Sequence, residues 1–312
     1  MDIDEGVAPA QSAGETAEVE VIVVAEGGRI GSSAKGALHH IPARGDRMTN
    51  ISQDVETAAA YGAEYAYPVF QFHHRPAVNS GIFQRLDRAI EHDLEKSADQ
   101  SSADEHLLRS FLTWVLQSYD ADRYAEIQRK HIPIAALDPI GRPLKYLNLP
   151  YFARRKVKHL RRLGLHCPPA KRILDIGCGS GHFQLMAGFF GHDCLGLDVP
   201  NRDPLYDALM EFFGVPKIDH RVEAQVPLPA LPHKYDVVTS FLTQFDANDR
   251  SPWDTESWRF FIDDVRKNCL TREGILYITL TSAGLMEPVK EYLHSVAELS
   301  RNDRTWLIRN SP

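Results

Sequence analysis

The chain has 312 residues, of which 43% are hydrophobic and 25% are charged, as in an ordinary globular protein with a sizeable core. Its formal net charge of −7 argues against general binding of nucleic acid. No apolar run is long enough to span a bilayer, and the four cysteines form no CxxC pair. We therefore expect no transmembrane segment, zinc site or redox dithiol.

The first half of the chain has an irregular start and a helical end. Residues 1–18 are acidic and lack the basic and apolar regions of a secretory signal, so we expect a disordered tail. The scattered single cysteines favour a reduced, cytoplasmic setting. Residues 19–150 are expected to form a mainly helical accessory region. Apolar periodicity predicts helices in it over Ile82–Lys96, Ala103–Tyr119 and Ala121–Lys130.

These amphipathic helices must bury their apolar faces, and the second half of the chain offers the nearest surface. We therefore expect residues 82–130 to form a cap over the carboxyl edge of a sheet, where the cap would shape an acceptor pocket and exclude water. The competing interpretation is a separate helical module joined by a linker around Pro133–Pro150.

Strand and helix patterns alternate over residues 151–312. Strands are expected over Arg172–Ile176, Asp193–Val199, His220–Glu223, Tyr235–Phe241, Ile275–Thr281 and Thr305–Arg309. Helices are expected over Arg154–Arg162, Phe183–Phe190, Pro204–Phe213, Asp254–Leu270 and Met286–Leu299. This alternation implies crossover connections and a mostly parallel sheet, which places residues 151–312 in the α/β class.

A glycine-rich turn joins the first of these strands to its helix. Residues 173–181 read Ile-Leu-Asp-Ile-Gly-Cys-Gly-Ser-Gly, and their glycines let the backbone turn sharply and approach a ligand closely. The next helix begins with unpaired N–H groups, which favour an anionic or accepting ligand group. Asp198 ends the following strand, where a carboxylate can accept two ribose hydroxyls. A dinucleotide fingerprint starting at Gly177 would need glycine where His182 stands.

This stretch resembles the class I, Rossmann-like family of S-adenosylmethionine (SAM)-dependent methyltransferases, whose sheet is doubly wound. The resemblance implies that Asp175 holds the SAM amino group, directly or through water, and that Asp198 binds the ribose. It continues through Asp236, which begins the fourth-strand motif, and through Gly274 before the fifth strand, and it covers about half of the chain.

The cofactor implied by the resemblance is SAM. The adenine contact would come from the segment after the third strand, where Glu223 and Gln225 are candidates and a solvent-facing role is an equal alternative. The expected cofactor-binding residues are Asp175, Gly177, Cys178, Gly179, Gly181, Asp198 and Glu223.

The end of the chain departs from the family pattern. The family closes its sheet with two antiparallel strands, and only Thr305–Arg309 is strand-like here. We therefore expect a sheet edge that is shortened or completed by the N-terminal half. This departure supports a second hypothesis, a catalytically inactive SAM-binding partner or regulatory subunit.

The catalytic residues are not identified by the sequence. An oxygen nucleophile needs a general base, and the loop after the fourth strand leaves the ligand-binding edge of the sheet, so Gln244, Asp246 and Asp249 are candidates against the alternative of a polar surface loop. His182 is expected to pack on the cofactor side. The favoured function is methyl transfer to a small polar acceptor, such as O-methylation of a saccharide or of a natural-product or glycolipid intermediate, by fold analogy.

The segment Arg154–Arg162 carries six basic residues beside an apolar stripe, which predicts an amphipathic helix. Its basic residues are Arg154, Arg155, Lys156, Lys158, Arg161 and Arg162. Such a helix could contact an anionic surface weakly, and the plainer interpretation is a solvated helix face. No metal ligand set is expected, since adjacent histidines lack the spacing of two ligands on one helix face.

Overall fold

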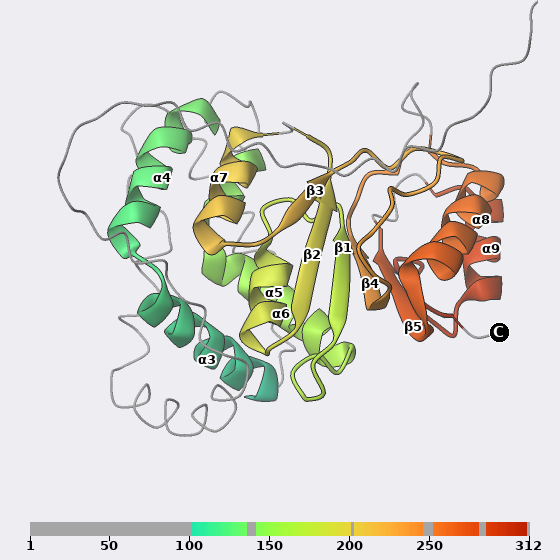
Figure 1. Cartoon of the computed structure of the whole chain (residues 1–312), viewed down its shortest axis with the longest axis horizontal. Coiled ribbons are helices and arrows are strands. Elements are labelled where there is room, and N and C mark those ends of the chain that lie inside the picture. The colour runs from blue at the N-terminus through green and yellow to red at the C-terminus, as the bar shows by residue number, and fades with distance from the viewer. Residues whose placement is uncertain (1–101, 136–141, 201–202, 246–251, 281–284, 311–312) are drawn as a thin grey trace, which may run out of the picture. The chain divides into compact units, whose positions relative to one another are not determined.

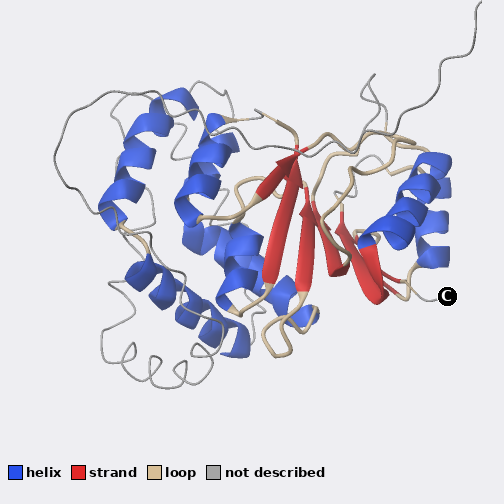
Figure 2. Ribbon diagram, in the orientation of Figure 1, coloured by secondary structure: helices blue, strands red, loops and turns tan. Residues whose placement is uncertain are grey.

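The described part of the chain is built around one seven-stranded sheet (Figures 1 and 2). The computed structural model describes residues 102–135, 142–200, 203–245, 252–280 and 285–310. The strands are β1 (Arg172–Ile176), β2 (Asp193–Asp198), β3 (Lys217–Asp219), β4 (Tyr235–Phe241), β5 (Leu270–Thr279), β6 (Leu299–Arg301) and β7 (Thr305–Arg309). The predicted tail over residues 1–18 and the predicted helix Ile82–Lys96 lie outside the described residues.

The sheet has the order β3-β2-β1-β4-β5-β7-β6. Strands β1 to β5 pair in parallel with one another, whereas β7 pairs antiparallel with both β5 and β6. The expectation of a shortened or borrowed edge is wrong, because the C-terminal segment itself supplies both edge strands. Strand β6 has only three residues, too few to show an alternating pattern in the sequence.

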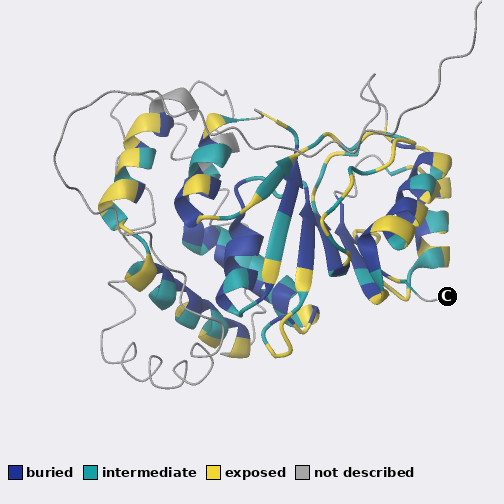
Figure 3. Ribbon diagram, in the orientation of Figure 1, coloured by how far each residue is buried: buried dark blue, intermediate teal, exposed yellow. Residues whose placement is uncertain are grey.

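Helices cover both faces of this sheet, as doubly wound folds require (Figure 1). One face carries α5 (Leu149–Arg162), α6 (His182–Phe189) and α7 (Pro204–Phe213), whose apolar residues share one buried cluster. The other carries α8 (Thr255–Asp264) and α9 (Glu287–Val296), which share a second cluster with β4, β5 and β7. The central strands between these clusters are largely buried (Figure 3).

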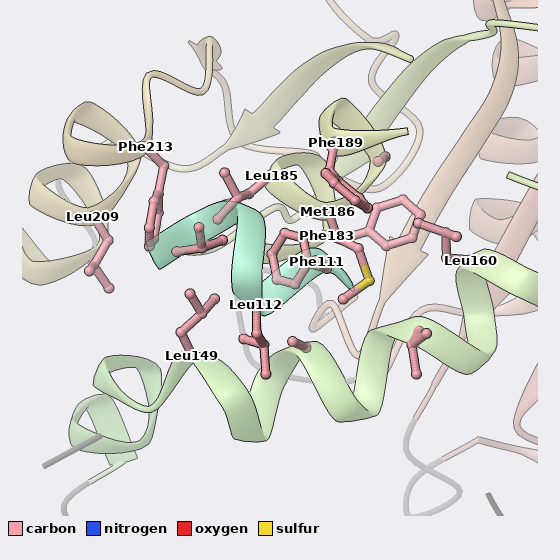
Figure 4. Packing of buried hydrophobic residues seen from close by; sticks show 14 of the residues in the cluster. Phe111, Leu112, Leu149, Leu160, Phe183, Leu185, Met186, Phe189, Leu209 and Phe213 are labelled. Atoms are coloured by element: carbon pink, nitrogen blue, oxygen red, sulfur yellow. The ribbon is translucent and has the colours of Figure 1, made fainter. Parts of the chain in front are cut away.

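Two further helices, α3 (Ser102–Ser118) and α4 (Ala121–Ala135), lie outside the first helix layer. Helix α3 packs on α5 and α6, where Phe111 and Leu112 meet Phe183 and Phe189 of α6 (Figure 4). Helix α4 packs on α7 and on the short 3₁₀ helix η1 (Arg142–Leu147). Helix α3 therefore covers the outer side of the helix layer, and it does not lie over the carboxyl edge where the cap was expected.

The first core continues across the predicted boundary at residue 150. Buried side chains of α3, α4 and η1 belong to the same cluster as those of α5, α6 and α7. The hydroxyl of Tyr124 on α4 donates to the carbonyl of Leu147 over 2.8 Å, and that of Tyr119 donates to the carbonyl of Phe213 over 3.1 Å. The division into domains stays a prediction, and the packing across it is continuous in the described residues.

Candidate functional site

The glycine loop between β1 and α6 fits tightly under the loop that follows β4. Gly177 has φ +71°, and a Cβ atom there would lie 2.2 Å from Thr243 Oγ1. No side chain larger than hydrogen therefore fits at Gly177 while Thr243 keeps its place. Gly181, with φ +73°, ends the loop, and α6 begins directly after it at His182.

The loop after β4 is tied to the glycine loop through Thr243. The Thr243 hydroxyl donates to the carbonyl of Ile176 over 2.9 Å and accepts from Ser240 Oγ over 2.8 Å. Leu242, between them, adopts φ +57° and is 51% exposed. The carboxyl ends of β1 and β4 are thus held together at the edge where open α/β sheets bind ligands.

Asp198 braces the glycine loop from the end of β2. Its Oδ2 accepts from the N–H of Gly179 over 2.6 Å, and its Oδ1 accepts from the N–H of Val199 over 2.7 Å. The side chain is 8% exposed. Each carboxylate oxygen has further accepting capacity, so the brace does not prevent bonds to two ligand hydroxyls.

Asp175 is buried in β1, in a row of polar residues that crosses the central strands. Parallel pairing aligns Asp175 of β1 with Thr239 of β4 and Tyr277 of β5. The Thr239 hydroxyl donates to Asp175 Oδ1 over 2.7 Å. Burial raises the pKa of Asp175 to about 6, against the opposing effects of the Lys156 ammonium and the Thr239 hydrogen bond.

Lys156 approaches this row from α5. Its ammonium lies 3.7 Å from the centre of the Phe241 ring, a cation–π contact at the last residue of β4. Burial lowers the pKa of Lys156 to about 8, although the Asp175 carboxylate acts in the opposite direction. Sequence reasoning missed Lys156 because it stood in a run of basic residues. Lys156 lies three residues after Ala153 and four before Leu160, both of which are buried. This helical spacing could have indicated that Lys156 lies next to the buried face of the helix.

An aromatic cluster lies against the other side of the glycine loop. Tyr146 of η1 has its Cε1 3.9 Å from the position that a Cβ on Gly179 would take. Its ring stacks on Phe152 with centroids 4.6 Å apart and contacts Tyr206 at the same distance. The sequence did not indicate that η1 reaches the cofactor loop.

His182 belongs to the same cluster. The imidazole stacks on Phe152 with centroids 4.8 Å apart, and its Nδ1 shares a 2.6 Å hydrogen bond with Ser180 Oγ. Burial and the Lys156 charge lower its pKa to about 3, so the ring is neutral at physiological pH. This position agrees with the expected packing role.

The side chains of the remaining site candidates form no hydrogen bond or ion pair with the glycine loop in the described residues. Cys178 turns its sulfur toward Met210 Sδ, 4.0 Å away, and burial raises the pKa of the thiol. Glu223 and Gln225 are exposed beyond the end of β3, and Gln244 is exposed after β4. Asp246 and Asp249 lie outside the described residues.

The basic segment is largely engaged within the fold. Arg154 pairs with Glu105 at 2.9 Å, and Arg161 pairs with Asp104 at 3.0 Å, both on α3. Arg162 donates to the Tyr277 hydroxyl over 2.8 Å, and Lys156 faces Phe241. These contacts leave a smaller basic surface than the sequence suggested.

Within the described ranges, no cluster of three or more His, Cys, Asp and Glu side chains could hold a metal ion. The same residues contain no helix that is both long and apolar enough to cross a membrane.

Comparisons with known proteins gave matches among solved structures alone. No protein-family model matches the chain, and no curated protein matches it. The glycopeptide N-methyltransferase MtfA is 14% identical over 43% of this chain and 56% of its own, with a TM-score of 0.30. A SAM-dependent methyltransferase from Mesorhizobium loti is 21% identical over 40% of this chain and 53% of its own, with a TM-score of 0.29.

A TehB-like SAM-dependent methyltransferase from Corynebacterium glutamicum is 17% identical over 52% of this chain and 95% of its own, with a TM-score of 0.32. The chain thus spans about half the length of MtfA and of the Mesorhizobium protein. These similarities are too low to assign the fold. The fold is assigned from the strand order and from the geometry of the glycine loop. By its order β3-β2-β1-β4-β5-β7-β6, its glycine loop and the acid that braces it, the described chain has the Rossmann-like fold of class I SAM-dependent methyltransferases.

Proposed function

We propose that the protein is a SAM-dependent methyltransferase that transfers a methyl group to a small polar acceptor. The observation that carries this proposal is the glycine loop, which is held between Thr243 and Asp198 at the carboxyl edge of β1 and β2. A loop so placed presents backbone rather than side chains to a ligand, beside a carboxylate suited to a ribose diol.

The residues present fit the parts of SAM. Asp198 would accept the ribose hydroxyls through the lone pairs that its two backbone bonds leave free. Asp175, near the carboxyl end of β1, would attract the amino group. Gly177, Gly179 and Gly181 would lie under the methionine and ribose portions, while Glu223 stays a proposal for the adenine end.

When bound, SAM supplies a methyl group that its sulfonium has already activated. The protein must then hold the acceptor in line and exclude water, and positioning of this kind contributes about 7–11 kcal/mol. Loss of a proton from an oxygen acceptor needs a base as well, worth about 10²–10⁴-fold. Gln244, Asp246 and Asp249, in the loop after β4, stay the proposed acceptor-side residues.

For the acceptor we favour a saccharide or a natural-product or glycolipid intermediate over nucleic acid. The net charge of −7 and the engagement of Arg154, Arg161 and Arg162 within the fold both disfavour a polyanion. An inactive SAM-binding partner is the alternative. Its main support was a shortened C-terminus, and the pairing of β6 with β7 removes that support.

Calorimetry with S-adenosylhomocysteine, together with a thermal unfolding scan, tests cofactor binding. A ligand that binds only the folded state stabilises it by about 2.7 kcal/mol at a hundredfold excess over Kd. We expect binding heat and a raised melting temperature. Absence of both at millimolar ligand would refute the proposal. Production of S-adenosylhomocysteine from SAM, across a panel of saccharide and lipid-linked acceptors, separates an enzyme from an inactive binder.

A further inference from the structure

Lys156 carries an ammonium group that pairs with no acceptor in the described part of the chain. Among the residues that the structure describes, its Nζ forms no hydrogen bond or ion pair, and it lies 3.7 Å from the centre of the Phe241 ring. Its neighbours on α5 differ in this respect, since Arg154 pairs with Glu105 and Arg162 with the Tyr277 hydroxyl. A desolvated cation over an aromatic ring retains strong attraction for an anion.

The position of this ammonium connects it with the proposed cofactor site. Phe241 ends β4 and Asp175 lies two residues before Gly177, so both belong to the carboxyl edge that the glycine loop occupies. Burial lowers the pKa of Lys156, and the Asp175 carboxylate acts in the opposite direction. One anion and one cation thus flank the same end of the loop.

The other charged groups near Lys156 add to the positive potential. Arg155, on the same helix, lowers the pKa of Lys156. Burial, and then the charges of Lys156 and Arg162, hold the pKa of His159 well below its usual value. The Nδ1 of His159 bonds the Tyr277 hydroxyl over 2.9 Å. A ligand that places a carboxylate near Lys156 would therefore meet an attractive field.

The amino-acid portion of SAM carries both charges that such a pair would recognise. Its ammonium would pair with Asp175, and its carboxylate requires a cation a few ångströms away. We propose that Lys156 binds the carboxylate of this amino-acid portion opposite Asp175, so that the two residues clamp the zwitterion. This inference rests on the proposed function and adds to it a binding residue on the helix that precedes the glycine loop.

Decarboxylated S-adenosylmethionine isolates the contact, because it keeps the sulfonium, the ammonium and the adenosine but lacks the carboxylate. We expect the wild-type protein to bind SAM about ten- to a hundredfold more tightly than decarboxylated SAM, the range for a charge-assisted hydrogen bond. In Lys156→Met this preference should fall to about onefold, with little change in affinity for decarboxylated SAM. Lys156→Arg should keep most of the preference.

Lys158→Met is the matched control, since it makes the same change on another face of α5. It should preserve the wild-type ratio. A wild-type protein that binds both ligands equally, or a Lys156→Met protein that still discriminates between them, would overturn the inference and leave the proposed function standing. A wild-type protein that binds neither ligand would overturn both.

Amine labelling of the unmodified protein gives a second test that needs no variant. SAM should protect Lys156 from acetylation by acetic anhydride, as measured by mass spectrometry, whereas decarboxylated SAM should not. Equal protection by both ligands, or protection by neither while calorimetry shows binding, contradicts a carboxylate contact even where Lys156→Met fails to fold.

Discussion

Asp198 connects cofactor recognition with local structure at the scale of single residues. Its carboxylate would accept ribose hydroxyls, and it already accepts the N–H groups of Gly179 and Val199. Asp198→Ala should therefore weaken S-adenosylhomocysteine binding by about 1.5–3 kcal/mol and also lower the free energy of unfolding by about 1 kcal/mol, because two half-buried N–H donors lose their acceptor.

Asp198→Asn provides the comparison for this prediction. It keeps one acceptor oxygen of similar shape, so its loss of stability should be smaller than that of the alanine variant while ribose binding still weakens. Calorimetry and urea unfolding measure the two effects separately. An Asp198→Ala protein with wild-type affinity would show that the ribose is bound elsewhere.

The raised pKa of Asp175 predicts that cofactor binding depends on pH. Its pKa is raised from 3.8 to about 6, so the carboxyl is ionised above that pH and neutral below it. Attraction of the SAM ammonium requires the ionised form, and affinity should therefore fall as the pH drops from 7 to 5. Calorimetric Kd values across this range test the prediction. Asp175→Asn should give weak binding with no such dependence.

The stability of the fold should change in the opposite direction over the same pH range. Because the folded-state pKa of Asp175 lies above its usual value, the folded chain takes up this proton before the unfolded chain does. The contribution of Asp175 to the free energy of unfolding should therefore rise as the pH falls from about 6 toward 4. The difference between wild type and Asp175→Asn in urea unfolding isolates that contribution.

The sequence indicated those site residues whose role follows from local spacing. Gly177 and Asp198 stand at the ends of consecutive strands, so a strand–turn–helix pattern was enough to identify them. Thr243, Lys156 and Tyr146 approach the same loop from distant parts of the chain. Their approach depends on how α5, η1 and the β4 loop pack, and that packing has no short-range signature.

At the scale of elements, the bounds were accurate where capping and turn residues were recognised and wrong where they were overlooked or lacking. Helix α7 was predicted in full because Pro204 begins it and Gly214 caps it with φ +63°. The start of α5 was missed, although Asn148 caps it by accepting the N–H of Tyr151 over 3.0 Å. Strand β3 lies at Lys217–Asp219 rather than His220–Glu223, since three polar-rich residues show no alternation.

The junction between β1 and α6 leads to a prediction about Gly177. Alanine there would adopt φ +71° and place its Cβ 2.2 Å from Thr243 Oγ1. The left-handed backbone alone costs about 1–2 kcal/mol, and the overlap adds about 1–3 kcal/mol. Gly177→Ala should thus destabilise the fold, displace the β4 loop and abolish detectable S-adenosylhomocysteine binding.

Gly164→Ala is the control that separates the two costs. Gly164 has φ +67°, close to that of Gly177, and an added Cβ there would meet nothing within 4 Å. In urea unfolding, Gly164→Ala should lose only the free energy that the left-handed backbone costs, and its affinity for the cofactor should be unchanged. If both variants lose the same stability and Gly177→Ala still binds the ligand, the contact with Thr243 does not constrain the loop.

At the scale of the whole molecule, the accessory helices are part of the core that supports the site. Helix α3 covers the α5–α6 layer with Phe111, and η1 brings Tyr146 to Gly179. Of the cap predicted over residues 82–130, helix α3 instead supports the outer side of the helix layer, and the contact with the glycine loop comes from η1, which lies outside that range. Amphipathic periodicity correctly predicted α3, but it could not indicate which surface the helix would cover.

A chain that begins at Leu149 tests this arrangement. It lacks α3, α4 and η1, so Phe183 and Phe189 lose their outer covering, and α5 loses its cap at Asn148. We expect it to bind a hydrophobic dye, to unfold at a lower urea concentration, and to bind S-adenosylhomocysteine more weakly than the full chain, with methyl transfer lost.

Tyr146→Ala in the full chain should reproduce part of the loss of affinity without the dye binding. The two results together would separate the loop contact of η1 from the packing role of α3. A chain from Leu149 that resists urea as well as the full chain and methylates its acceptor at the full rate would show that the N-terminal half is an independent module.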